Sequence, residues 1–397
     1  MDMPEWWEQR RFGVLFEPSV AAVAGWAPIG TDAADYRALV EAPMVEVLAH
    51  HRDRWAHVAR FDDFVDLLDF GDFDPDGWAA LAVDAGAGYA ATTARHHDGW
   101  RWWSARDTDQ TTVTRGPRVD AVAAFARSAR DRGLVAGVYY STRADGADGD
   151  ATAEIADVVS VHDLGFVVVD GEPDPDVTAG IATATPGVVV DIPHPAGSIG
   201  PEHVHGHTQL PDRIVGAPWQ LRWPLGSGHG YNRADGPAQV LDADCIVALL
   251  TEVVAKGGHL LLGVAVDGDG AVVADQASAL RDAGRWIASH RRLVDHGRPW
   301  REWGDDEVRY VLVDDTLHAV DVACRGRFAA LGRAAVRVTD VRLGGSPVAF
   351  TQDDEALHVD APRPVRDRRR SIGRTPGPAA AVYEIDVADV DAPAALF

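Results

Sequence analysis

The chain has 397 residues, which is long for one ordinary domain and leaves room for a barrel of about 250 residues or more beside a smaller domain. Hydrophobic residues make up 46% of the chain and charged residues 25%, values typical of a globular protein with a large core. The 37 basic and 61 acidic residues give a net charge of −24, which argues against nucleic acid and anionic membrane as partners.

Features that bear on location point to the cytoplasm. Residues 1–11 lack the basic segment and apolar core of a signal peptide, and no apolar stretch approaches membrane-spanning length. Cys245 and Cys324 lie far apart in sequence, as is typical of reduced thiols. We expect a cytoplasmic protein without a membrane partner, and the sequence leaves a homo-oligomer open.

Residues 1–296 alternate strand and helix patterns, which predicts a (β/α)8 TIM-like barrel. The predicted strands are 12–16, 89–94, 134–140, 166–170, 188–191 and 259–264. The predicted helices are 43–54, 74–86, 120–132, 151–162, 238–256 and 275–290. The link before 188 is too short for a full outer helix, and 192–233 reads as irregular, so we expect an imperfect ring of helices.

From about Arg298 the pattern changes to short alternating strands separated by Asp, Gly and Pro, at 308–313, 317–322, 336–343 and 380–387. This pattern predicts an antiparallel β-sandwich packed against the barrel. The expected domains are a catalytic barrel at 1–296 and a β-sandwich at 297–397.

Polar side chains follow the strand at 89–94. His96, His97 and Asp98 come at its carboxyl end, and Trp100 supplies a flat apolar surface beside them. Glu17 follows the strand at 12–16, and Asp170 ends the valine-rich strand at 166–170. Because the active sites of such barrels form at the carboxyl ends of the strands, these groups predict a pocket for a sugar, with hydrogen bonds to hydroxyls and an aromatic face for the ring.

Several segments, in this order, resemble the α-L-fucosidases of glycoside hydrolase family 29. They are F-D-P-D-G-W at 73–78, A-R-H-H-D-G-W at 94–100, D-R-G-L-V-A-G-V-Y-Y-S at 131–141, V-V-V-D-G at 167–171, G-Y-N-R at 230–233, V-A-K-G-G-H-L-L-L-G at 254–263 and G-R-P-W at 297–300. The resemblance covers nearly the whole chain. It implies a barrel followed by a β-sandwich, and a retaining mechanism with two carboxyl groups about 5–5.5 Å apart.

The resemblance also implies roles for individual residues. Asp170 matches the nucleophile, His96 and His97 match a sugar-binding histidine pair, and Tyr140 is expected to line the same pocket. The acid/base of the family comes from the loops after the nucleophile strand. The candidates for it here are Asp212, which we place first, Glu202, Glu172 and Glu17.

Three positions depart from the family. Glu17-Pro18-Ser19 stands where family members usually read His-Trp-Gly, and His229 stands where a Trp usually contacts the sugar. Gln220 follows Trp219 where a Glu is common, and an amide cannot transfer a proton as a carboxylic acid does. Glu17, Trp219 and His229 are therefore predicted substrate-binding positions, and L-fucose, L-galactose and related sugars are all candidates.

Two other functions compete with a retaining exo-glycosidase. The run H-V-H-G-H at 203–207 would suit a metal-dependent barrel hydrolase, because alternate residues of a strand point to one face and His is a common zinc ligand. We place that run in the irregular segment rather than on a barrel strand, and expect no metal or organic cofactor. The substitutions at positions 17, 220 and 229 would suit a weakly active or inactive sugar-binding relative.

Overall fold

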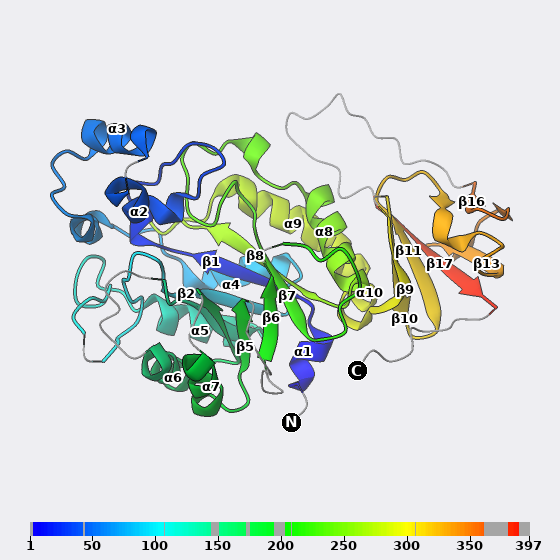
Figure 1. Cartoon of the computed structure of the whole chain (residues 1–397), viewed down its shortest axis with the longest axis horizontal. Helices are drawn as coiled ribbons and strands as arrows, with labels where there is room; N and C mark the ends of the chain where they lie inside the picture. The colour runs from blue at the N-terminus through cyan, green and yellow to red at the C-terminus, as the bar shows by residue number, and fades with distance from the viewer. Residues whose placement is uncertain are drawn as a thin grey trace.

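The computed structural model describes residues 3–42, 44–106, 108–143, 151–171, 175–193, 203–207, 209–305, 307–360 and 380–388. Side chains at 175–178, 182, 193 and 203–207 lie outside this description. The chain forms a closed barrel and a smaller all-β part, which lie side by side along the long axis of the molecule (Figure 1).

Eight parallel strands form the barrel in chain order, and β8 pairs with β1 to close it. Their bounds are β1 Phe12–Glu17, β2 Tyr89–Arg95, β3 Val135–Ser141, β4 Phe166–Asp170, β5 Val189–Pro193, β6 His203–His207, β7 Trp219–Pro224 and β8 His259–Ala265. The predicted (β/α)8 barrel is confirmed. Its carboxyl-end mouth is therefore the place to look for an active site.

The prediction that 192–233 is irregular was wrong, because β6 and β7 lie within it and complete the barrel. Neither strand carries the apolar run that marks a buried parallel strand. β6 reads H-V-H-G-H and β7 reads W-Q-L-R-W-P, so their strand character comes from the ladders that they form with β5 and β8.

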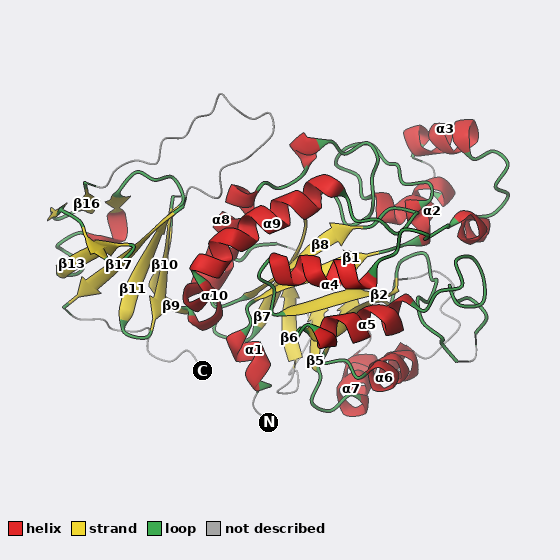
Figure 2. Ribbon diagram, turned by 180° about the vertical axis from the view of Figure 1, so that it is seen from behind, coloured by secondary structure: helices red, strands yellow, loops and turns green. Residues whose placement is uncertain are grey.

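Six helices cover the outside of the barrel (Figure 2). They are α4 Pro75–Asp84, α5 Ala121–Asp131, α6 Ala151–His162, α7 Pro175–Ala184, α8 Ala243–Ala255 and α9 Ala274–Ser289. Asp74, Asp120 and Asp242 cap three of them by accepting a backbone N–H from the first turn. The described residues between β5 and β7 include no helix, but the link before β5, predicted to be too short, holds the ten-residue α7.

A long excursion between β1 and α4 surrounds the carboxyl-end mouth, at the left of Figure 1. It contains η1 Val20–Ala22, η2 Ala33–Asp35, α2 Tyr36–Glu41, α3 Val45–Arg54 and η3 Phe61–Leu67. The short α1, Glu5–Gln9, covers the opposite end, where the ring of Trp7 stacks on His259 at 3.7 Å. The amino end of the barrel is thus filled with aromatic side chains, and the mouth is left for ligands.

The carboxyl-terminal part consists of two antiparallel sheets. The larger has the order β14-β13-β17-β11-β10-β9, and the smaller β12-β16-β15. Their bounds are β9 Arg298–Gly304, β10 Val308–Val313, β11 Thr316–Asp321, β12 Arg327–Phe328, β13 Val338–Leu343, β14 Ser346–Pro347, β15 Phe350–Gln352, β16 Leu357–Val359 and β17 Ala381–Val387. The predicted β-sandwich is confirmed, with a core of its own around Trp300, Tyr310 and Tyr383.

The helix α10, Arg291–His296, leads from the barrel into β9, so the change of structure falls where the sequence changes texture. The larger sheet packs on α8 and α10. Arg309 of β10 forms a 2.6 Å ion pair with Glu252 of α8, and Trp286 Nε1 donates to the carbonyl of Ala380 at 3.3 Å. Among the helices described, none is both long and apolar enough to cross a membrane.

Candidate active site

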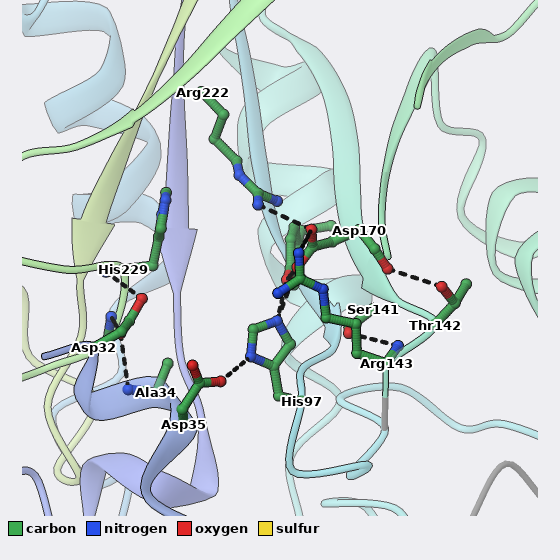
Figure 3. Close-up of polar contacts among 12 residues, drawn as sticks. Asp32, Ala34, Asp35, His97, Ser141, Thr142, Arg143, Asp170, Arg222 and His229 are labelled. Atoms are coloured by element: carbon green, nitrogen blue, oxygen red, sulfur yellow. Dashed lines mark hydrogen bonds and ion pairs between the residues drawn. The ribbon is translucent and has the colours of Figure 1, made fainter. Parts of the chain in front are cut away.

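Asp170 is the last residue of β4, and its side chain is 2% exposed. Its Oδ2 lies 2.8 Å from His97 Nε2 and accepts a 2.6 Å hydrogen bond from the hydroxyl of Tyr139. Its Oδ1 accepts from Arg222 at 3.1 Å and lies 3.4 Å from an Arg143 guanidinium nitrogen (Figure 3). Four donors therefore surround one buried carboxylate and fix its orientation.

His97 lies between two carboxylates, as Figure 3 shows. Its Nε2 contacts Asp170, and its Nδ1 lies 2.7 Å from Asp35 Oδ1. Asp35 ends η2 in the excursion, whereas Asp170 ends a barrel strand. A single imidazole thus connects the rim of the mouth to the barrel wall.

The turn after β2 presents His97 to the mouth. Gly99 N donates to the carbonyl of His96 at 3.0 Å, which closes the turn. The buried carboxylate of Asp98 accepts from Trp100 N at 3.0 Å and from Val20 N at 2.7 Å. Asp98 is therefore a structural residue that ties the turn to the start of the excursion.

The contacts decide the charges of the three linked groups. Burial alone would raise the pKa of Asp170, but the hydrogen bond from His97 and the charge of Arg222 hold it well below its ordinary value. Burial would lower the pKa of His97, but its two carboxylate partners raise it to about 9. The hydrogen bond with His97 lowers the pKa of Asp35. At neutral pH Asp170 and Asp35 are therefore carboxylates, and His97 between them is an imidazolium.

Tyr139 rather than Tyr140 lines the site. The hydroxyl of Tyr140 donates to Glu154 at 2.8 Å on the outer side of β3 and accepts from Arg95 at 3.1 Å. Tyr139 packs with the residues that fill the barrel interior and reaches Asp170. The prediction for Tyr140 was wrong by one residue, and in a strand one residue reverses the face.

Arg222 is a site residue that the sequence did not reveal. It lies on β7, is 11% exposed, and its guanidinium stacks over the ring of Tyr139 at 5.0 Å as it reaches Asp170. The sequence held one signal, because an arginine directly follows the buried run W-Q-L at 219–221. Recognising it depended on recognising β7 as a strand. Asp35 and Arg143 carried no comparable signal.

The far side of the mouth holds Glu17 and His229. Glu17, the last residue of β1, has a side chain only 1% exposed, and its Oε1 lies 3.2 Å from His229 Nδ1. His96 lies deeper, with its ring 4.5 Å from that of His97. Burial lowers the pKa of His96 well below its ordinary value, so the histidine pair has one neutral ring and one charged ring.

Gln220 lies inside the barrel below the mouth. Its Nε2 donates to Asp191 Oδ2 at 2.5 Å, and its Oε1 accepts from the Tyr89 hydroxyl at 2.7 Å. Burial raises the pKa of Asp191 to about 7. Gln220 therefore holds a buried polar cluster together, and its side-chain hydrogen bonds go to Asp191 and Tyr89 rather than to Asp170.

Three other predicted residues lie away from the mouth. Trp100 is 2% exposed and belongs to the core between barrel and helices, so its indole offers no face to a sugar. Trp219 begins β7 at the amino end, packs on Gly258 and donates to the carbonyl of Lys256 at 3.3 Å. Asp212 is exposed and follows Pro211, whose carbonyl accepts from that same lysine.

The first choice of acid/base is contradicted by this placement. Lys256 lies at the end of α8, just before the amino end of β8, so Asp212 is at the opposite end of the barrel from Asp170. The reason is that the 209–218 link runs back to the start of β7. Glu202 and Glu172 lie outside the described residues.

His203–His207 forms the barrel strand β6, so the prediction that this run lies in an irregular segment and not on a barrel strand was wrong. Among the side chains that the structure describes, no group of three or more His, Cys, Asp or Glu is placed to hold a metal ion. The side chains of β6 lie outside that description.

Comparison with known proteins supplies the context for this geometry. A family model described as Alpha-L-fucosidase matches residues 1–164 and 183–291, which is more than half of the chain. Curated relatives include an alpha-L-fucosidase of Dictyostelium discoideum, 22% identical over 75% of this chain and 73% of that protein. The tissue alpha-L-fucosidase of Homo sapiens is 23% identical over 91% of this chain and 85% of that protein.

Solved structures share the fold. The Thermotoga maritima alpha-fucosidase has a TM-score of 0.81 at 22% identity, covering 96% of this chain and 97% of that chain. A Bacteroides thetaiotaomicron alpha-L-fucosidase of glycoside hydrolase family 29, described as a trapped covalent intermediate, has a TM-score of 0.77 at 14% identity and covers 98% of each chain. The barrel and sandwich of this chain are therefore those of the fucosidase fold.

Proposed function

The chain belongs to the alpha-L-fucosidase family, and from this premise we propose that it is a retaining exo-glycoside hydrolase that releases a terminal L-fucose or a closely related sugar. One observation carries the proposal. The buried carboxylate of Asp170, at the carboxyl end of β4, is kept ionised and oriented by His97, Tyr139 and Arg222. An ionised, immobilised carboxylate in a barrel mouth is what a glycosidase nucleophile requires.

In the first step Asp170 attacks the anomeric carbon. A bond forms between a carboxylate oxygen and that carbon, the glycosidic carbon–oxygen bond breaks, and the departing oxygen takes a proton from the acid. The positive charges of His97 and Arg222 keep Asp170 deprotonated at neutral pH and so ready to react. In the second step water attacks the same carbon, gives a proton to the base and releases Asp170.

The proton donor must be a carboxyl group that is protonated at working pH. Asp35 does not meet this requirement, because its hydrogen bond with His97 lowers its pKa, and we assign it to orienting that ring. Asp212 is at the wrong end of the barrel. We propose that the donor is Glu172, the second residue after β4 in the sequence, and we rank Glu202 below it because it directly precedes His203, the first residue of β6.

Two measurements test the proposed function. A screen of 4-nitrophenyl glycosides should show turnover of an α-L-fucoside or of a glycoside of a related L-sugar. Proton NMR of the first product formed should show the same anomer as the substrate, because two displacements at one carbon restore its configuration. Release of the opposite anomer would rule out the covalent mechanism, and absence of turnover on the whole panel would favour the sugar-binding alternative.

We also propose that the protein acts in the cytoplasm on small glycosides. Support comes from Cys245 and Cys324, which form no disulfide in the described structure. Fractionation of the native cells, with activity as the readout, tests this location.

The comparisons give no support to a metal-dependent hydrolase, and stoichiometric zinc in the purified protein with activity lost to a chelator would reopen that alternative.

A further inference from the structure

Glu17 and His229 form a polar wall on one side of the mouth. Glu17 reaches over β8 at Gly263, where a Cβ atom would lie 1.9 Å from Oε1. Only a glycine at that position leaves room for this carboxylate. The side chain of Glu17 is 1% exposed, and a buried carboxylate is costly unless charged or polar groups surround it.

His229 is held in place through its backbone. Its N–H donates to Asp32 Oδ2 at 3.1 Å, and the next N–H, that of Gly230, donates to Oδ1 of the same residue at 3.1 Å. The same Oδ1 caps η2 by accepting from Ala34 N at 3.0 Å. The loop after β7 and the excursion are therefore joined at His229, as Figure 3 shows.

The imidazole of His229 has one nitrogen committed and the other available. Nδ1 lies 3.2 Å from Glu17 Oε1, and no hydrogen bond to Nε2 is found among the residues that the structure describes. The side chain is 21% exposed, so part of the ring opens to the mouth. A ligand can thus meet the exposed part of the imidazole with the carboxylate behind it.

The wall and Asp170 act on the same two neighbouring side chains. The negative charges of Glu17 and Asp170 both act on Arg222, raising its pKa, and both also raise the pKa of Tyr139. Arg222 and Tyr139 therefore lie within electrostatic reach of both carboxylates. In the closed barrel, β4 lies across from β8 and β1 is next to β8, so the wall faces Asp170 across the mouth.

A sugar with its anomeric carbon at Asp170 extends across the mouth toward this wall. The ring atom farthest from the anomeric carbon is C4, and the group at C5 lies next to it, so the C4 hydroxyl and the C5 group both face the wall. L-Fucose and L-galactose have the same ring configuration and differ at C5, which carries a methyl group in the first and a hydroxymethyl group in the second. A methyl group at C5 would leave part of the polar wall without a hydrogen-bond partner, and a site built to bond a hydroxyl discriminates strongly against an analogue that lacks it.

We propose, on the basis of the proposed function, that Glu17 and His229 select a terminal L-sugar with a hydroxymethyl group at C5, so that α-L-galactosides are better substrates than α-L-fucosides. Both residues are specificity-determining. The hydroxyl donates to the Glu17–His229 pair.

The test compares kcat/KM for 4-nitrophenyl α-L-galactoside and 4-nitrophenyl α-L-fucoside. The wild-type ratio should favour the galactoside. Glu17→Gln, which keeps the shape and removes the charge, should lower that ratio roughly tenfold to a hundredfold, because a hydrogen bond to a charged group is lost. The double variant E17H/H229W, which restores the usual residues of the family, should favour the fucoside.

Asp235→Asn is the matched control. Asp235 is in the same loop as His229, but its carboxylate is used by Ser227, at 2.6 Å to Oγ and 2.9 Å to N. This variant should leave the ratio unchanged. Binding of free L-galactose and L-fucose to the wild-type protein, measured by calorimetry, gives a readout that does not depend on the folding of a variant, and L-galactose should bind more tightly.

Three outcomes separate this inference from the function on which it rests. A wild-type preference for the fucoside that E17Q leaves unchanged would overturn the inference and leave the retaining mechanism intact. Turnover of both substrates that survives loss of Asp170 would overturn the proposed function. A galactoside-to-fucoside ratio of kcat/KM that falls in E17Q and not in D235N supports both the inference and the proposed function.

Discussion

The two sides of the barrel mouth differ in how they resemble the family. On the side of β2 to β4 lie His96, His97 and Asp170, which the sequence resemblance pairs with family residues, and the contacts of Asp170 with His97 and Arg222 keep the proposed nucleophile ionised. On the other side, Glu17 and His229 depart from the family and contact each other. Under the proposed function, bond cleavage and sugar selection are carried by different strands, so that one can change while the other is kept.

The largest effect is expected on the side of β2 to β4, from the substitution Asp170→Gly. Without the nucleophile, kcat should fall by roughly 10³-fold or more, and Tm should also fall, because His97 and Arg222 lose the buried carboxylate that balances their charges. Added azide should restore part of the turnover by entering the vacated space. A rate within tenfold of the wild type would exclude Asp170 as the nucleophile and remove the basis of the comparison.

The second prediction concerns His97, whose raised pKa gives a pH dependence. A histidine with a folded pKa of about 9 and an ordinary value of 6.5 stabilises the fold fully below pH 6.5, and this contribution is lost as pH rises to about 9. Both Tm and kcat/KM should therefore decline in this range. His97→Gln should lower kcat/KM roughly 10- to 100-fold and flatten the decline of Tm. An unchanged Tm profile in the variant would assign the decline to another group.

The third prediction uses two adjacent tyrosines as a matched pair. Tyr139→Phe removes a hydrogen bond to Asp170 and should lower kcat/KM roughly tenfold or more. Tyr140→Phe removes bonds to Glu154 and Arg95 on the outer face, and should lower stability by about 1 kcal/mol with activity nearly unchanged. Urea unfolding and steady-state kinetics on both variants check the assignment, and the reverse pattern would place Tyr140 in the site.

The smallest effect is expected at Asp212. Because this residue is exposed at the amino end of the barrel, Asp212→Asn should change kcat/KM less than about twofold. Glu172→Gln and Glu202→Gln are the informative companions. The one that removes the acid should slow glycosides with poor leaving groups far more than 4-nitrophenyl glycosides. If D212N, and not one of these two variants, slowed glycosides with poor leaving groups selectively, the 209–218 link would have to reach the mouth.

The barrel could be predicted from the sequence because β1 to β4 and β8 are apolar runs separated by helical patterns. The residues at the ends of two such runs, His97 and Asp170, could be placed at the mouth for the same reason. β6 and β7 could not, since their polar residues interrupt the run, and Arg222 was missed with them. Nor did the sequence reveal α7 in the short link before β5.

The side chains that meet across the mouth were harder to predict than the strands. Buried parallel strands are apolar on both faces, so nothing in Y-Y at 139–140 shows which tyrosine points inward. Asp35 lies 62 residues from His97 in sequence, in an excursion with many acids, and only the folded chain brings them together. The contact between Glu17 and His229 likewise spans 212 residues.

The most direct test of the account is to trap the covalent intermediate. The wild-type protein, treated with a 2-deoxy-2-fluoro-glycosyl fluoride of the preferred L-sugar and digested, should yield one peptide heavier by the fluoroglycosyl group, with the label on Asp170. The label on any other carboxyl group, or steady turnover of the reagent by a protein in which Asp170 is replaced by Gly, would contradict the account.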